Sequence, residues 1–202
     1  MTDVLIILFD YSGTFAFSVS GALAAAEKKL DLFGALFLGF VTAIGGGTTR
    51  DMMIGNTPVS WLQDPVYFYI IVAAVGLTFL FTNTILRFPK ALFLFDTIGI
   101  SVFTIIGIQK GLHAGIHPPL AVMMGILTAV MGGIIRDVLC NEIPLIFHRE
   151  IYATACLAGG VFFVLFVFLN MPESFTALIA AGVIFTIRSL SVRKGWALPR
   201  FK

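Results

Sequence analysis

Seven apolar segments follow one another along the chain, with short polar connections between them. A membrane-spanning α-helix needs about 20 mostly apolar residues, so each segment predicts one helix. The connections hold charged residues, asparagines and prolines, which are typical of turns. We therefore predict an all-α membrane protein with seven transmembrane helices, at approximately residues 4–26, 32–54, 66–86, 92–111, 118–140, 151–171 and 174–192.

The composition supports this prediction. Of the 202 residues, 58% are hydrophobic and only 12% are charged, and the mean hydropathy is +1.00. A soluble protein could not cover so much apolar surface with polar side chains. The net charge of +2 says little about partners, and nothing in the sequence supports nucleic-acid binding.

A three-helix unit occurs twice. A constant shift of 86 residues brings identical residues into register, without a gap, from the first segment to the turn after the second. Because three is odd, the second copy must enter the membrane from the opposite face, so the two copies are expected to be inverted repeats. The shift matches Asp10 with Asp96, Gly13 with Gly99, Phe17 with Phe103, Gly21 with Gly107, Gly39 with Gly125, Thr42 with Thr128, Ala43 with Ala129, Gly46 with Gly132, Gly47 with Gly133, Arg50 with Arg136, Asp51 with Asp137 and Pro58 with Pro144.

The repeat divides the chain into three parts. Residues 1–88 form the first three-helix repeat, residues 89–172 the second, inverted repeat, and residues 173–202 the seventh helix with a basic cytoplasmic tail. The basic residues predict the orientation, because Lys and Arg concentrate in cytoplasmic loops. With Arg50 and Arg136 set aside, the expected outer side holds only Lys110, so the N-terminus is predicted outside and the C-terminus in the cytoplasm. The expected cytoplasmic side holds Lys28, Lys29, Arg87, Lys90, Arg149, Arg188, Arg193, Lys194, Arg200 and Lys202.

Two short segments interrupt the apolar pattern at matching places in the second and fifth predicted helices. Each contains glycines followed by an adjacent Arg-Asp pair: Gly45, Gly46, Gly47 and Arg50-Asp51, then Gly132, Gly133 and Arg136-Asp137. Glycine weakens a helix by about 1 kcal/mol, and a charge at membrane depth costs at least about 2.5 kcal/mol. The glycines are expected to kink or break each helix where it lines a polar path. The alternative is close helix packing alone.

The arginines are expected to find partners on other helices, because neighbouring residues of a helix do not face each other. Inversion should place Arg50 toward the outer side and Arg136 toward the cytoplasm. The charges then either form ion pairs that fix the packing or guard the two mouths of a water-filled path, and the two interpretations are compatible.

Matching acids and hydroxyls are further candidates. Asp10 and Asp96 are either caps near helix ends, or face the path or neutralise the arginines across it. Hydroxyl oxygens with a few acids suit a weakly selective route for monovalent cations. The hydroxyls expected to line the path are those of Ser18, Thr42, Thr104 and Thr128.

No enzyme is predicted, because no set of nucleophile, base and oxyanion donors and no phosphate-binding loop is readable. His113 and His117 lack a third ligand, so neither a metal nor another cofactor is expected. Lys110 is interpreted as an interfacial anchor, although it could also shape the field at the outer mouth. The expected non-protein contacts are membrane lipid and permeant K⁺ or Na⁺.

At these glycine and Arg-Asp segments, the sequence resembles the bacterial type of the trimeric intracellular cation channel family, including the duplicated small membrane domain also described as a glycine transporter. The resemblance covers nearly the whole chain. It implies a homotrimer in the inner membrane, with a pore for K⁺ and Na⁺ in each subunit around kinked helices two and five. The Lys-Glu-Val motif of the animal branch is absent, since Ile44 precedes the glycines here, so regulation of the animal type is not expected.

Two functions remain open. A carrier of glycine or another small zwitterion would use broken helices of the same kind, binding the carboxylate at a helix N-terminus. The channel is the favoured hypothesis, and a purely structural membrane protein is a further alternative.

Overall fold

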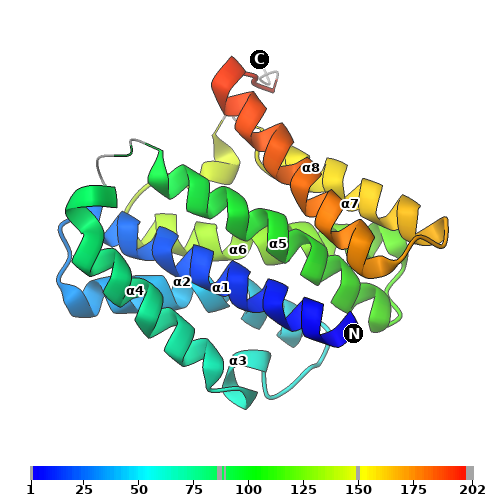
Figure 1. Cartoon of the computed structure of the whole chain (residues 1–202), viewed down its shortest axis with the longest axis horizontal. Helices are drawn as coiled ribbons and strands as arrows, with labels where there is room; N and C mark the ends of the chain where they lie inside the picture. Colours follow the sequence, from blue (N-terminus) through cyan, green and yellow to red (C-terminus); the bar gives the residue numbers. More distant parts are fainter. Residues whose placement is uncertain (1, 86–87, 89, 149–150, 199–202) are drawn as a thin grey trace.

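The computed structural model describes residues 2–85, 88, 90–148 and 151–198, and helices joined by short connections make up this part of the chain (Figure 1). A long helix occupies each of the seven predicted segments, with ends within a few residues of those predicted. Two short helices lie in connections. The helices are α1 (Thr2–Glu27), α2 (Leu32–Met53), α3 (Ser60–Gln63), α4 (Val66–Ile85), α5 (Ala91–His113), α6 (Pro118–Leu139), α7 (Ala153–Phe168), α8 (Glu173–Lys194) and the 3₁₀ turn η1 (Leu145–Phe147).

Five helices of the described chain are long and apolar enough to cross a membrane: α1, α2, α5, α6 and α8. The apolar parts of α4 and α7 are shorter, at Val66–Thr82 and Ala153–Phe168. Side chains on the outer surface are largely apolar, including Phe33, Leu80 and Phe168, which are all more than 65% exposed. An exposed apolar belt of this kind fits a bilayer better than water.

Helices α1, α2, α5 and α6 form the centre of the molecule. Each of the pairs α1–α2, α5–α6, α1–α5 and α2–α6 packs along an extensive interface. Helix α4 covers α1 and α2, whereas α7 and α8 cover α5 and α6 (Figure 1). The central four helices therefore bring most of the residues matched by the 86-residue shift into one core.

The 86-residue shift recurs in the backbone. The turn after α2 has Gly55 at φ 70°, and the turn after α6 has Asn141 at φ 55°. In the same turns the amide of Asn56 donates to the Asp51 carbonyl (2.8 Å), and that of Glu142 donates to the Asp137 carbonyl (2.9 Å). The sequence match thus extends to matching local geometry.

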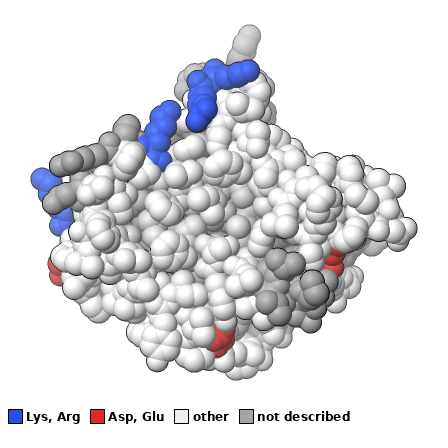
Figure 2. Space-filling view, in the orientation of Figure 1, with Lys and Arg blue, Asp and Glu red and all other residues white. Residues whose placement is uncertain are grey.

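The exposed basic residues of the described chain gather at one end of the molecule, where α1 and α8 end and α5 begins (Figures 1 and 2). Lys28 there donates a hydrogen bond to Glu142, which lowers the pKa of that carboxyl. Arg188 does not belong to this surface. It was predicted to be a cytoplasmic surface charge, but it is fully buried within α8. Four other basic residues of the predicted side lie outside the described residues: Arg87, Arg149, Arg200 and Lys202.

Candidate functional site

The first buried charge cluster lies at the C-terminal end of α2 and consists of Arg50, Asp51, Ser60 and Lys110. The Arg50 Nε atom donates to Asp51 Oδ1 (2.8 Å). The other carboxylate oxygen of Asp51 accepts bonds from the Ser60 amide (2.8 Å) and hydroxyl (2.5 Å). Lys110, from the last turn of α5, donates to the Ser60 hydroxyl (2.9 Å) and lies 3.7 Å from Asp51.

A small cavity of about 20 Å³ adjoins this cluster. It is lined by Arg50 and Asp51 of the cluster, and by Asp10, Tyr67 and Phe103 among others. The Arg50 Nη1 atom is buried and has no hydrogen-bond partner in the described part of the chain. The cavity is large enough for about one water molecule, and its polar lining suits one.

The second buried charge cluster lies at the C-terminal end of α6 and is built around Arg136. This arginine is 1% exposed. Its Nε atom donates to Asp137 (2.8 Å), and its Nη1 atom donates to Asp96 of α5 (2.8 Å) and to Ser20 of α1 (2.5 Å). The second oxygen of Asp137 accepts from the Leu145 amide (3.0 Å). One arginine thus joins α1, α5 and α6.

Arg188 of α8 completes the second cluster. Its Nη2 atom lies 3.4 Å from Asp96, and its guanidinium stacks on the rings of Tyr152 (4.2 Å) and Phe93 (4.9 Å). With Asp137, the two arginines and two aspartates balance in charge. Sequence reasoning missed this role, although a single charge inside the apolar segment 174–192 was the signal for it.

The arginines also pair with the aspartates beside them, although the sequence favoured partners on other helices. Both adjacent pairs, Arg50 with Asp51 and Arg136 with Asp137, are hydrogen-bonded. The rule for neighbouring residues concerns the direction of Cβ atoms, whereas the long arginine side chain folds back to the carboxylate. Arg136 also has the predicted partner on another helix, Asp96.

The two acids occupy different clusters. Asp96 is fully buried and binds two arginines, so the interpretation of Asp96 as a cap is wrong. Asp10 is 6% exposed and lines the cavity beside Arg50. Each acid therefore lies with the arginine of its own repeat.

The glycine segments lie where α2 and α6 cross. A Cβ atom on Gly46 would overlap the carbonyl oxygen of Thr128, and one on Gly132 would overlap that of Thr42. Both helices continue through the glycines, so the prediction of a break is wrong, and the kink stays a prediction. The physical reason is that the glycines are used for contact between two helix backbones, which stabilises the crossing without unwinding either helix.

The remaining glycines of these segments make room for side chains. A Cβ atom on Gly45 would lie 2.6 Å from Ile135. Gly47 and Gly133 lie one turn before the arginines, and each leaves space beside a guanidinium, with the Nη2 atom 3.6 Å from the position of a Cβ. The glycines therefore allow close packing and also leave room for the arginine side chains to fold back.

The predicted hydroxyls are buried within the four central helices. Thr42, Thr104 and Thr128 donate to the carbonyl four residues earlier in their own helix, at 2.6, 2.6 and 2.8 Å. Ser18 donates to the Ile71 carbonyl of α4 at 3.4 Å. Each of these hydroxyls uses its hydrogen in such a bond, and its oxygen can still accept hydrogen bonds through its lone pairs.

A stacked aromatic pair lies between the two clusters. The rings of Phe17 and Phe103 are 5.2 Å apart at an interplanar angle of 26°, and both residues are at most 2% exposed. Phe103 lines the cavity beside Arg50, and Phe17 lies 3.5 Å from the Cβ position of Gly132, one turn before Arg136. The pair fills the centre with apolar rings.

The fold and the two clusters define a helical membrane protein that holds charged groups in its core. The family model described as Glycine transporter matches residues 7–83 and 93–168, and the chain belongs to this family. The UPF0126 inner membrane protein YadS of Escherichia coli is 40% identical over 98% of this chain and 97% of its own length. A UPF0126 membrane protein of Vibrio cholerae is 43% identical over 98% and 83%.

Solved structures of TRIC cation channels share the fold. The TRIC trimeric intracellular cation channel orthologue from Rhodobacter sphaeroides is 37% identical, with a TM-score of 0.90 over 95% of this chain and 98% of that one. A prokaryotic TRIC channel crystallised in 0.5 M KCl is 30% identical, with a TM-score of 0.89 over 98% and 100%. The resemblance stated from the sequence is thereby confirmed.

Proposed function

We propose that the chain is a membrane channel for monovalent cations, K⁺ and Na⁺, rather than an enzyme. The observation that carries the proposal is the TM-score of 0.90 at 37% identity to a solved cation channel. The conduit would run inside each subunit between α1, α2, α5 and α6, with one charge cluster at each mouth. Its lining would comprise Asp10, Ser18, Thr42, Arg50, Asp51, Asp96, Thr104, Thr128, Arg136 and Asp137.

The two halves are proposed to be inverted repeats within seven membrane spans. The 86-residue match in sequence, turns and glycine contacts supports this arrangement, as does the match of one family model to both halves. The N-terminus would lie outside and the C-terminus in the cytoplasm, in keeping with the exposed basic end. The name of a solved relative supports a homotrimer.

The proposed conduit is closed in this state by the Phe17–Phe103 pair. Opening would require the rings to separate, and the smooth glycine contact between α2 and α6 would let these helices bend or slide. No metal or other cofactor is proposed for conduction, since the charged groups of both clusters come from the chain itself.

A carrier of glycine or another small zwitterion is the second candidate, and the family description favours it. Purified protein in liposomes separates the two functions. A channel predicts K⁺ efflux that grows with the K⁺ gradient, and no saturable uptake of labelled glycine. Saturable glycine uptake without K⁺ efflux would overturn the channel in favour of the carrier.

A further inference from the structure

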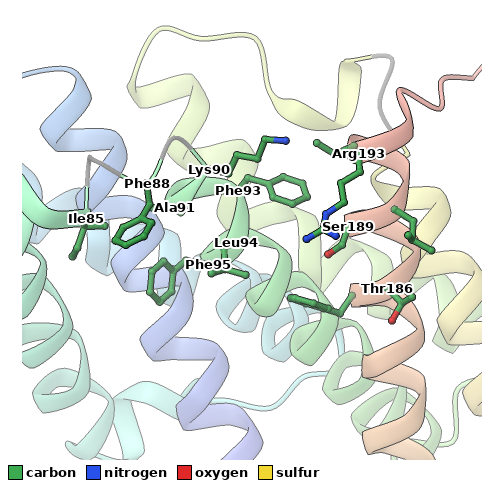
Figure 3. Close-up of a pocket in the computed structure, with 13 residues that line it drawn as sticks. Ile85, Phe88, Lys90, Ala91, Phe93, Leu94, Phe95, Thr186, Ser189 and Arg193 are labelled. Carbon is green, nitrogen blue, oxygen red and sulfur yellow. The ribbon is translucent and has the colours of Figure 1, made fainter.

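A groove of about 820 Å³ lies between the end of α4, the start of α5 and α8 (Figure 3). Its volume is that of a pocket for a small molecule or a lipid chain. The lining is mostly apolar, and its phenylalanines and leucines are Phe88, Phe93, Leu94, Phe95, Phe185 and Leu190. Neither charge cluster contributes a residue to it.

One end of the groove is cationic. Lys90 precedes α5 and Arg193 lies in the last turn of α8, and both line the groove. Figure 3 shows their cationic ends pointing into the gap between these two helices, above Ser189. The described lining holds no acidic residue. The groove therefore joins an apolar trough to a positive end, at the basic end of the molecule.

The structure assigns this groove to an anionic phospholipid, with an acyl chain along the phenylalanines and leucines and the phosphate between Lys90 and Arg193. Burial of the chain is favourable because it fills an apolar trough, and the positive end complements the charge of the phosphate. The hydroxyl of Ser189 is a further donor to the phosphate oxygens. A zwitterionic lipid would bring a second, positive headgroup charge to the same two residues, so the anionic lipid is favoured.

The groove adjoins the second charge cluster. Lys90, Phe93 and Val192 line both the groove and a neighbouring cavity of about 320 Å³, which Arg188 also lines. The ring of Phe93 stacks on the Arg188 guanidinium at 4.9 Å. A bound lipid would hold this ring in place, so its effect would reach the cluster through Phe93. The binding itself does not depend on cation conduction.

Native mass spectrometry of the purified full chain, with added phosphatidylglycerol or phosphatidylcholine, tests the assignment. The wild type should bind one phosphatidylglycerol per chain, several-fold more tightly than phosphatidylcholine. Lys90→Gln combined with Arg193→Gln should weaken phosphatidylglycerol binding about 30-fold, since each basic residue near an anionic headgroup contributes about a factor of five. Thr186→Trp should fill the trough and weaken both lipids while leaving the charges in place.

Lys29→Gln is the matched control, because Lys29 is exposed at the same end of the molecule but does not line the groove. It should leave the lipid affinities unchanged. Equal binding of the two lipids by the wild type, or equal weakening by Lys29→Gln, would overturn the assignment. If Lys90→Gln combined with Arg193→Gln binds phosphatidylglycerol as the wild type does but no longer forms an oligomer, the groove would instead be an interface with a second copy of the chain.

Discussion

Arg136 and Arg188 share one carboxylate, that of Asp96, and all three side chains are buried. A buried charge without a partner is strongly unfavourable, so the folded chain depends on keeping the second cluster complete. The first cluster differs, because Lys110 is partly exposed and connects it to the surface. The two clusters thus predict different consequences of substitution.

Asp96→Asn should destabilise the protein by about 3–5 kcal/mol, because it leaves two buried arginines with one remaining aspartate. Thermal unfolding in detergent measures the effect as a clear fall in Tm. Glu142→Gln is the control, since Glu142 pairs with Lys28 on the surface and its loss should change Tm little. Equal Tm values for the two variants would show that Asp96 does not hold the second cluster together.

Lys110→Gln should raise the unitary cation conductance, because it removes a positive charge 3.7 Å from Asp51 at one proposed mouth. Lys29→Gln, at the other end of the molecule and outside both clusters, should have a smaller effect. Currents through single channels in a planar bilayer provide the measurement. Unchanged conductance would return Lys110 to the role of an interfacial anchor, the interpretation made from the sequence.

At the scale of elements, α2 and α6 meet through their backbones. Gly46 contacts the region of Thr128, and Gly132 contacts that of Thr42, so the same contact occurs twice, related by the 86-residue shift. Such a close approach to the threonine backbone is possible because the glycine on the facing helix has no side chain. The crossing brings the ends of the two helices, and hence the two arginines, to opposite sides of the core.

Gly132→Ala should lower stability by about 1–3 kcal/mol, the typical cost of overpacking a well-packed core. The added methyl meets a backbone carbonyl, which cannot move aside by changing a rotamer. Gly182→Ala in α8 is the matched control, because its Cβ would meet open space and alanine favours the helix. In thermal unfolding, Gly132→Ala should lower Tm relative to the wild type, whereas Gly182→Ala should raise it. A Gly132→Ala variant as stable as Gly182→Ala would contradict the close crossing.

Hydropathy was sufficient to predict the long helices, because segment length and apolarity alone determine them. The repeat was readable because matching residues recur at a constant shift of 86, and the turn geometry recurs although Gly55 is replaced by Asn141 and Asn56 by Glu142. The prediction that the glycines break α2 and α6 was wrong, because a sequence does not show which helix approaches a glycine. The stacking of Phe17 on Phe103 depends on a contact between distant helices, so spacing along the chain gave no direct signal for it. For Arg188 the lone charge in an apolar segment was a signal, but its partner Asp96, 92 residues away, could not be read from the sequence.

On the scale of the whole molecule, two charge clusters are separated by the apolar Phe17–Phe103 pair. Along the proposed conduit, a cation entering at one cluster would meet these rings before reaching the other cluster. An apolar constriction of this kind can stop ions by excluding water. In the proposed channel, this state would be a closed conduit with an aromatic centre and polar groups on both sides.

Phe17→Ala and Phe103→Ala should each increase K⁺ efflux from liposomes, because each removes half of the apolar constriction. Each will also cost about 3–5 kcal/mol of stability through the cavity it leaves, so the amount of folded protein must be matched by size-exclusion chromatography. Phe79→Ala, on an exposed position of α4, is the control and should leave efflux unchanged. Reduced or unchanged efflux in both core variants would place the conduit elsewhere.

The most direct measurement of cation conduction is the reversal potential of the purified wild-type protein in a planar bilayer with a KCl gradient. We expect discrete current steps that reverse close to the equilibrium potential of K⁺, with similar steps when Na⁺ replaces K⁺. Absence of steps from protein that is folded and inserted, or reversal close to the equilibrium potential of Cl⁻, would contradict this expectation.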